Sequence, residues 1–208
     1  ATGGVFSILI SSLSDGANNV EAIAVDTLGN VGPTASATLY IDTTAPSVPV
    51  INSLPASINV TSYPVTGTAE VGSIVYVYIG DVLVATGSSD GTFSVPLTNI
   101  PTGSNTISVV VKDVLGNPSP TTSSTLYIDI SAPAAPVFTS VPTTINVTSY
   151  AVTGTAEAGS TVKVYLAGVL QGTATAGPAF SINIPTLDQG SNTVTATATD
   201  ALNNVSTV

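Results

Sequence analysis

Hydrophobic and polar residues alternate along short stretches of this chain, and turn-forming residues separate these stretches. Residues 65–69 alternate Val, Gly and Ala with Thr, residues 74–79 alternate Val with Tyr, and residues 107–112 carry Ile or Val at every second position. A period of two residues is typical of a strand that buries one face. Turn signals stand at 80–81 and 90–91, and no stretch has a helical period. Within residues 43–129 the pattern predicts seven strands, at 48–52, 65–69, 74–79, 82–85, 92–97, 107–112 and 125–128.

This pattern belongs to a unit that repeats every 87 residues. INVTSYPVTGTAE at 58–70 returns as INVTSYAVTGTAE at 145–157, and 12 of the 14 positions from 57–70 match those of 144–157. The same offset relates Phe6, Phe93 and Phe180. One unit repeated head to tail explains these matches without any insertion. The predicted domains are therefore 1–42, the C-terminal part of one unit; 43–129, a complete unit; and 130–208, a unit that lacks its last strand.

The two ends of the chain duplicate each other, because residues 1–34 align with 175–208 in register. The two ends therefore cannot complement each other: if copies of this piece exchanged strands, each copy would receive strands that it already has. We therefore expect a segment of a longer array.

The composition narrows the classes of function. The chain has 43% hydrophobic and only 7% charged residues, which argues against a disordered polyelectrolyte. A net charge of −10, with Lys112 and Lys163 as the only basic residues, argues against binding to nucleic acid or to an anionic membrane surface. No apolar run approaches the roughly 18 residues of a spanning helix. The absence of His and Cys removes the usual general base, disulfides and zinc ligands, so we expect no enzyme.

Four ordered elements resemble the bacterial immunoglobulin-like domains found in tandem in giant surface adhesins and biofilm proteins. They are D-x-[TS]-A-P at 42–46 and 129–133, V-T-G-T-A-E-x-G-S at 65–73 and 152–160, G-T-F-S at 91–94, and D-x-L-G-N at 26–30 and 113–117. The last element departs to D-x-L-N-N at 200–204. The resemblance covers the whole chain. With the strand pattern, it predicts an all-β fold of tandem seven-stranded antiparallel immunoglobulin-like β-sandwiches.

The resemblance implies an extracellular location, either on a cell surface or secreted. It also implies a non-catalytic spacer role in an adhesin, stalk or surface fibre, often with Ca²⁺ bound at the domain junctions. The expected partners are the neighbouring domains of the same chain and other copies in a fibre. Two alternatives remain open: a carbohydrate- or protein-binding module acting through the face that bears the recurring tyrosines or through the loops, and a self-assembling surface filament subunit.

Acidic residues recur at three fixed points of the unit, although the chain has only 12 of them. Alternating strands bring the N-terminal linker, the second-to-third strand loop and the sixth-to-seventh strand loop to one pole of each sandwich. Carboxylates meeting there would repel one another unless a cation bridged them, and Ca²⁺ accepts six to eight oxygen ligands in irregular shells. The predicted metal ligands are Asp42, Glu70, Asp113, Asn117, Asp129, Glu157, Asp200, Asn204 and Asp26.

A second interpretation of these acids is that they only order turns. Asp42 can form an Asx-turn, and Asp113 can order its loop by accepting hydrogen bonds from backbone N–H groups. The sequence leaves both interpretations open.

Overall fold

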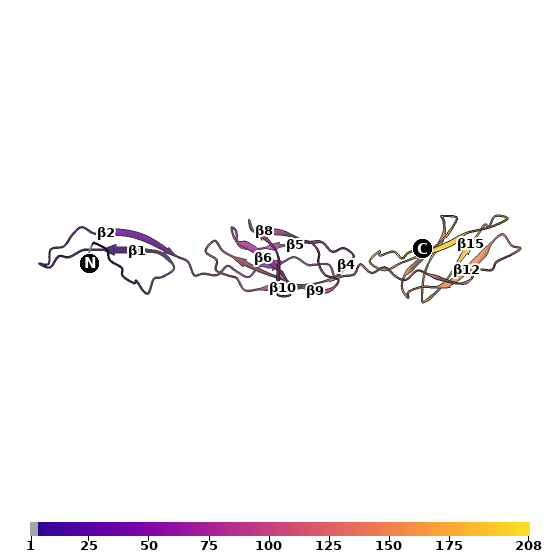
Figure 1. The fold of residues 1–208 in the computed structure, drawn as a ribbon, viewed down its shortest axis with the longest axis horizontal. Coiled ribbons are helices and arrows are strands. Elements are labelled where there is room, and N and C mark those ends of the chain that lie inside the picture. Colours follow the sequence, from indigo (N-terminus) through magenta and orange to yellow (C-terminus); the bar gives the residue numbers. More distant parts are fainter. Residues whose placement is uncertain (1–3) are drawn as a thin grey trace.

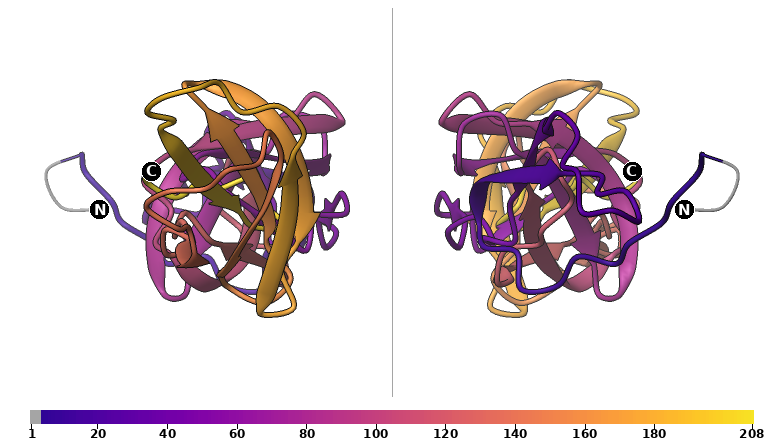
Figure 2. Two further views of the ribbon diagram at one scale, coloured as in Figure 1. Left: turned by 90° about the vertical axis from the view of Figure 1, so that its right-hand side faces the viewer. Right: turned by 90° about the vertical axis from the view of Figure 1, so that its left-hand side faces the viewer.

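The computed structural model describes residues 4–208; the first three residues of the predicted first segment lie outside this range. The chain forms three successive β-structured bodies along one long axis (Figure 1), and they overlap when viewed along that axis (Figure 2). The strands are β1 (Gly16–Ala22), β2 (Ala35–Ile41), β3 (Val50–Ile51), β4 (Ser57–Ile58), β5 (Tyr63–Thr68), β6 (Ile74–Ile79), β7 (Val82–Ser88), β8 (Thr92–Leu97), β9 (Gly103–Lys112), β10 (Thr122–Ile128), β11 (Val137–Ser140), β12 (Tyr150–Thr155), β13 (Thr161–Leu166), β14 (Val169–Thr175), β15 (Ala179–Ile184) and β16 (Val194–Thr199).

The middle unit is a two-sheet sandwich, as the alternating pattern predicts. One sheet has the order β3-β5-β8 and the other has the order β4-β10-β9-β6-β7. The inward positions of both sheets form one core, in which Val65, Val77, Val109 and Leu126 are fully buried. Their side chains leave water on folding, and this burial is the main source of stability for a chain without disulfides.

The first strand of the middle unit differs from the prediction. The predicted strand 48–52 is shortened to β3, which pairs with β5, and a strand that was not predicted, β4, follows and pairs with β10 in parallel. The unit therefore contains eight strand segments instead of the predicted seven, and its strands pair antiparallel as predicted except for the two-residue pairing of β4 with β10. Pro55 lies between β3 and β4 and has no backbone N–H to donate to a β-ladder. The chain leaves one sheet there and joins the other.

Strand β9 begins four residues before its predicted start. Asn105 occupies an inward position and is 5% exposed, and this polar side chain interrupted the apolar pattern. Its amide nitrogen donates to the carbonyl oxygens of Pro101 (2.8 Å) and Gly103 (3.0 Å). The buried amide is thus satisfied locally, which permits its place in the core.

The glycine of the V-T-G-T motif makes room for a phenylalanine. A Cβ on Gly67 would lie 2.6 Å from Cζ of Phe93 and would overlap the carbonyl oxygen of Val50. A Cβ on Gly154 would meet Phe180 at the same distance. The repeated glycine and the repeated phenylalanine are therefore two halves of one packing contact between β5 and β8, and between β12 and β15.

The third unit has two three-stranded sheets, β11-β12-β15 and β14-β13-β16. The first segment contains the hairpin of β1 and β2, paired antiparallel over seven residues. Its Leu39 is 45% exposed, whereas Leu126, at the equivalent position of the complete middle unit, is fully buried.

Candidate functional site at the domain junctions

The loop between β9 and β10 is closed by the carboxylate of Asp113. One carboxylate oxygen accepts hydrogen bonds from the backbone N–H groups of Leu115 and Asn117, both at 2.9 Å. The other oxygen accepts a bond of 2.7 Å from the side-chain amide of Asn117. Gly116 lies between them at φ +93°, a conformation that glycine adopts without strain. The D-x-L-G-N motif is therefore a self-contained turn built around one carboxylate.

The same turn forms in the other two units. Asp200 accepts bonds of 2.8 and 2.9 Å from the backbone N–H groups of Leu202 and Asn204 and one of 2.8 Å from the Asn204 side chain. Asp26 and Asn30 repeat the arrangement in the first segment. The departure from the motif in the third unit follows the same backbone, since Asn203 replaces the glycine at φ +70°. Asparagine is among the few other residues that adopt this left-handed region readily.

The loops at 113–117 and 200–204 also hold the linker that enters their unit. The side-chain amide of Asn117 donates to the carbonyl oxygen of Asp42 at 3.0 Å, across 75 residues of sequence. The amide of Asn204 makes the same 3.0 Å bond to the carbonyl oxygen of Asp129. Asp42 and Asp129 directly follow the last strands of the preceding units, β2 and β10. A single side chain therefore connects the turn of one unit to the end of the unit before it.

The preceding unit holds the linker from the other side. At the first junction, the carboxylate of Asp15 accepts bonds from the backbone N–H and the hydroxyl of Thr43 and from the hydroxyl of Thr44. At the second junction, the N–H of Asp129 donates to the carbonyl oxygen of Ile58 at 2.9 Å. The two linkers are thus held between consecutive units by different bonds on the upstream side and by an asparagine on the downstream side.

Sequence reasoning missed Asp15. Its equivalents in the other two units are Thr102 and Gln189, so repeat comparison gave no sign that this acid is used. The only available signal was that an acid is present in a chain that otherwise avoids charge.

The linker acids form the turns that the second interpretation predicted. Asp42 accepts a bond from the N–H of Thr44, and Asp129 accepts one from the N–H of Ser131, both at 3.0 Å. The predicted ligands Glu70 and Glu157 close the β5–β6 and β12–β13 turns through their backbone carbonyl oxygens, which accept bonds from Ser73 and Ser160.

The acids of the third unit do gather at one pole, as strand counting predicted. Asp129, Glu157 and Asp200 line one open hollow of about 480 Å³, together with Tyr127 of the middle unit. In residues 4–208, however, no group of three or more acidic side chains is arranged to hold a metal ion. The carboxylates of Asp113 and Asp200 are engaged by their own loops, so the calcium site remains a prediction.

These hydrogen bonds stabilise the charged form of the loop acids. The amide of Asn117, together with backbone N–H groups, holds the pKa of Asp113 below its ordinary value of 3.8. For Asp200 the largest single influence is burial, which raises the pKa, but the bonds from Asn204 and the backbone outweigh it and the net pKa is lowered. The pKa of Asp15 is lowered chiefly by the hydroxyl of Thr43. Hydrogen bonds to the ionised form account for all three directions.

We expect the loops to open in acid. Because the folded-state pKa values of Asp113 and Asp200 lie below the unfolded value, their contribution to stability is fully present above that value. The contribution is lost as the pH falls through the folded-state pKa, in the range below about 4. An NMR titration of the Leu115 and Leu202 amides should follow each carboxylate, with midpoints below 3.8. A midpoint at or above that value would show that these carboxylates do not hold the loops.

The recurring tyrosines lie on strands of the sandwiches. Tyr78 on β6 pairs with Leu83, Tyr165 on β13 pairs with Leu170, and both tyrosines are half-buried. The hydroxyl of Tyr150 lies 2.6 Å from that of Ser140.

Comparison with protein families decides the identity of the repeat. A model of the bacterial Ig domain matches residues 45–127 and 132–208, which together are more than half of the chain. The chain belongs to the bacterial Ig domain family. The two matched regions fall within the complete and the third unit. Bacterial Ig domains are structural modules, typically extracellular or surface-exposed. No curated protein matches the chain in sequence.

Solved structures with low sequence identity are similar to this tandem of bacterial Ig domains. Fibronectin(III)-like modules of CbhA from Clostridium thermocellum are 16% identical, with 76% of this chain and 89% of that chain covered and a TM-score of 0.46. A marsupial T cell receptor is 10% identical, with coverage of 88% and 66% and a TM-score of 0.47. A variant of titin domains I67–I69 is 15% identical, with coverage of 91% and 73% and a TM-score of 0.38. In the described part of the chain, no helix could span a membrane.

Proposed function

We propose that this chain is a non-catalytic spacer segment of an extracellular bacterial adhesin, stalk or surface fibre, in which consecutive Ig domains are held in line. One observation carries the proposal: the bond from Asn117 to the carbonyl oxygen of Asp42 recurs, at the same length, from Asn204 to that of Asp129. A repeated bond between a domain and the strand end of its predecessor restricts bending at every junction in the same way.

The restraint acts mainly by limiting the conformations of the linker. A hydrogen bond of this kind contributes about 0.5–1.5 kcal/mol net, so one bond alone biases the junction only several-fold toward the held state. The upstream bonds of Asp15 and of the Ile58 carbonyl add to it. Pro46 and Pro133, each a few residues further along its linker, stiffen the chain further. The result is an extended series of sandwiches with limited hinge motion.

Solution scattering tests the spacer function. Small-angle X-ray scattering of the intact chain should give a maximum dimension close to that of the in-line arrangement in Figure 1. A variant in which residues 42–46 and 129–133 are replaced by Gly and Ser should scatter as a more compact ensemble, because such linkers behave as flexible coils. Identical scattering from the two proteins would contradict the proposal.

The proposal includes Ca²⁺ bound at the domain junctions, and this part can be tested separately. It is supported by the hollow that Asp129, Glu157 and Asp200 share at the second junction. An ion that binds the folded junction and not the unfolded chain would stabilise it by about 2.7 kcal/mol at a hundredfold excess over its Kd. We therefore expect Ca²⁺ to raise the Tm and a chelator to reverse the change. An unchanged Tm and an unchanged maximum dimension would remove calcium and leave the asparagine bonds as the restraint.

A further inference from the structure

Strand β15 is an edge strand with one open side. It pairs with β12 in regular register, without a bulge, and among residues 4–208 no strand pairs with its other side. The equivalent strand of the complete middle unit, β8, ends the sheet β3-β5-β8 in the same way. The open edge is therefore a feature of the fold that both units share.

The hydrogen bonds of the β12–β15 ladder show which backbone groups of β15 face outward. Ala156 donates its N–H to the carbonyl oxygen of Pro178 at 2.9 Å. In an antiparallel ladder, pairs that bond each other alternate with pairs that do not. Ala179, Ser181 and Asn183 therefore direct their N–H groups away from β12, and these three N–H groups have no hydrogen-bond partner in the described part of the chain.

In the middle unit the same edge is blocked at both ends. By the same alternation, Thr92, Ser94 and Pro96 occupy the outward positions of β8. The carboxylate of Asp90 accepts a bond from the N–H of Thr92 at 3.2 Å and one from its hydroxyl at 2.9 Å, and Pro96 has no N–H. Of these three positions, only Ser94 keeps a free outward N–H. Charged residues and proline are two devices that protect edge strands from pairing with another chain.

The third unit lacks both devices. Gly177 stands in place of Asp90, and Asn183 stands in place of Pro96. Its edge therefore offers three outward N–H groups where β8 offers one. A regular, uncharged edge strand of this kind is a template for pairing with another strand.

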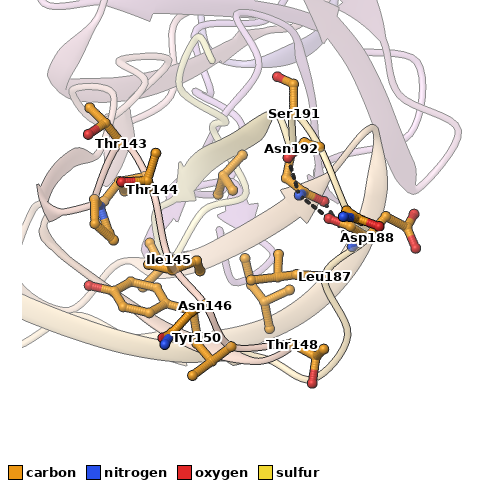
Figure 3. Close-up of a pocket in the computed structure, with 18 residues that line it drawn as sticks. Thr143, Thr144, Ile145, Asn146, Thr148, Tyr150, Leu187, Asp188, Ser191 and Asn192 are labelled. Carbon is orange, nitrogen blue, oxygen red and sulfur yellow. Dashed lines mark hydrogen bonds between the residues drawn. The ribbon is translucent and has the colours of Figure 1, made fainter.

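The absence of charge around β15 favours a second copy of the chain as the occupant. No charged residue occurs between Lys163 and Asp188. Asp188 lies in the loop after β15, where its backbone is bonded to the side chain of Asn192 (Figure 3). Copies of a chain with a net charge of −10 repel one another. A twofold contact also places identical groups together, so it requires a stretch without charge.

We propose that the β15 edge is a contact between two copies of this chain, which pair antiparallel about Ser181. In this register Ser181 faces its own counterpart, and Ala179 of each copy faces Asn183 of the other. Each outward N–H then meets a carbonyl oxygen, and the two sheets join into one. The contact is isologous, so it closes as a dimer. This inference does not depend on the spacer function, because it concerns an edge of the third unit and not the junctions.

Sedimentation of the intact chain tests the proposal. Its mean mass should rise from that of a monomer towards that of a dimer between about 10 µM and 1 mM, because a single strand pair is a small contact of low affinity. Asn183→Pro places the proline of β8 at the equivalent position and removes an outward N–H without breaking a bond to β12. It should raise the Kd of the dimer about tenfold or more. The matched control, Asn183→Ala, keeps the N–H and should leave the Kd unchanged.

Two further measurements do not depend on the folding of Asn183→Pro. Asp90→Gly combined with Pro96→Asn gives β8 the residues of β15, and this variant should associate beyond the dimer through its second open edge. In the unaltered chain, hydrogen exchange of the Ser181 and Asn183 amides should slow as the protein concentration rises.

Three results would overturn this assignment. They are a monomeric mass at every concentration, equal Kd values for Asn183→Pro and Asn183→Ala, and hydrogen exchange at Ser181 that is independent of concentration. A monomeric chain that instead binds a synthetic peptide of residues 179–184 would assign the edge to a separate strand and would also contradict the proposal.

Discussion

Replacing Gly67 with alanine is expected to destabilise the middle domain by about 3 kcal/mol. The added Cβ would lie 2.6 Å from Cζ of Phe93 and would overlap the carbonyl oxygen of Val50. The ring is 5% exposed and belongs to the core of the middle unit, and the carbonyl belongs to the strand that pairs with β5. Relief of the overlap therefore requires a shift of the backbone or of the ring. By differential scanning calorimetry, the transition of the middle domain should fall by about 12–20 °C.

The control lies on the same strand. Thr68 is the adjacent residue of β5, with an exposed side chain, so Thr68→Ala changes strand propensity without adding volume to the core. We expect it to cost less than about 1 kcal/mol. Gly154→Ala should reproduce the effect of Gly67→Ala in the third domain, because its Cβ would lie 2.6 Å from Cζ of Phe180. If Gly67→Ala had only the effect of Thr68→Ala, the packing account would be wrong.

Replacing Leu126 with alanine should have an effect of similar size, about 3–4 kcal/mol. Leu126 is fully buried between the two sheets, and its removal leaves a cavity that a close-packed core fills only partly. In a chemical denaturation series, the midpoint of the middle domain should fall without a large change in slope.

The chain provides its own control for Leu126→Ala. Leu39 occupies the equivalent position in β2 within the same Leu-Tyr-Ile sequence, but it is 45% exposed. Leu39→Ala should therefore cost much less than Leu126→Ala. Equal costs for the two variants would mean that burial in the sandwich does not decide the stability of this position.

The sequence predicted the strands well because the sandwich buries one face of each strand. Val65, Val77 and Val109 lie at the inward positions that their alternation indicated, and all three are fully buried. The pattern failed where a polar residue is satisfied inside the core. Asn105 bonds to backbone carbonyl oxygens, and this cannot be inferred from its type or spacing.

Sequence reasoning placed the acids of the third unit at one pole of the sandwich, but it did not predict which groups they bond. Asp129, Glu157 and Asp200 line one hollow, and their assignment as metal ligands stays a prediction. Whether a carboxylate faces a neighbour or closes its own turn depends on differences of a few ångströms, which the topology does not determine. Asn117 was predicted as a metal ligand, and in the structure its side chain connects the Asp113 carboxylate to the linker carbonyl of Asp42.

The upstream side of the linker could not be predicted from the repeat. Asp15 meets Thr43 and Thr44 only because β1 and β2 pair over their whole length, which places the two ends of the hairpin together. That contact spans 28 to 29 residues, and Thr102 stands in place of the acid in the middle unit. Repeat comparison finds what the units share, and this bond is specific to the first junction.

Distance measurements across the second junction test the central claim, that Asn204 restricts bending between consecutive domains. The chain has no Cys, so Ser88→Cys on β7 and Thr175→Cys on β14 give two specific spin-label sites on exposed, equivalent positions. In calcium-free buffer, double electron–electron resonance should give a narrow distance distribution. Asn204→Ala should broaden it clearly, and the control Asn183→Ala, on an exposed position of β15, should not. Equal widths with and without the Asn204 side chain would contradict the account.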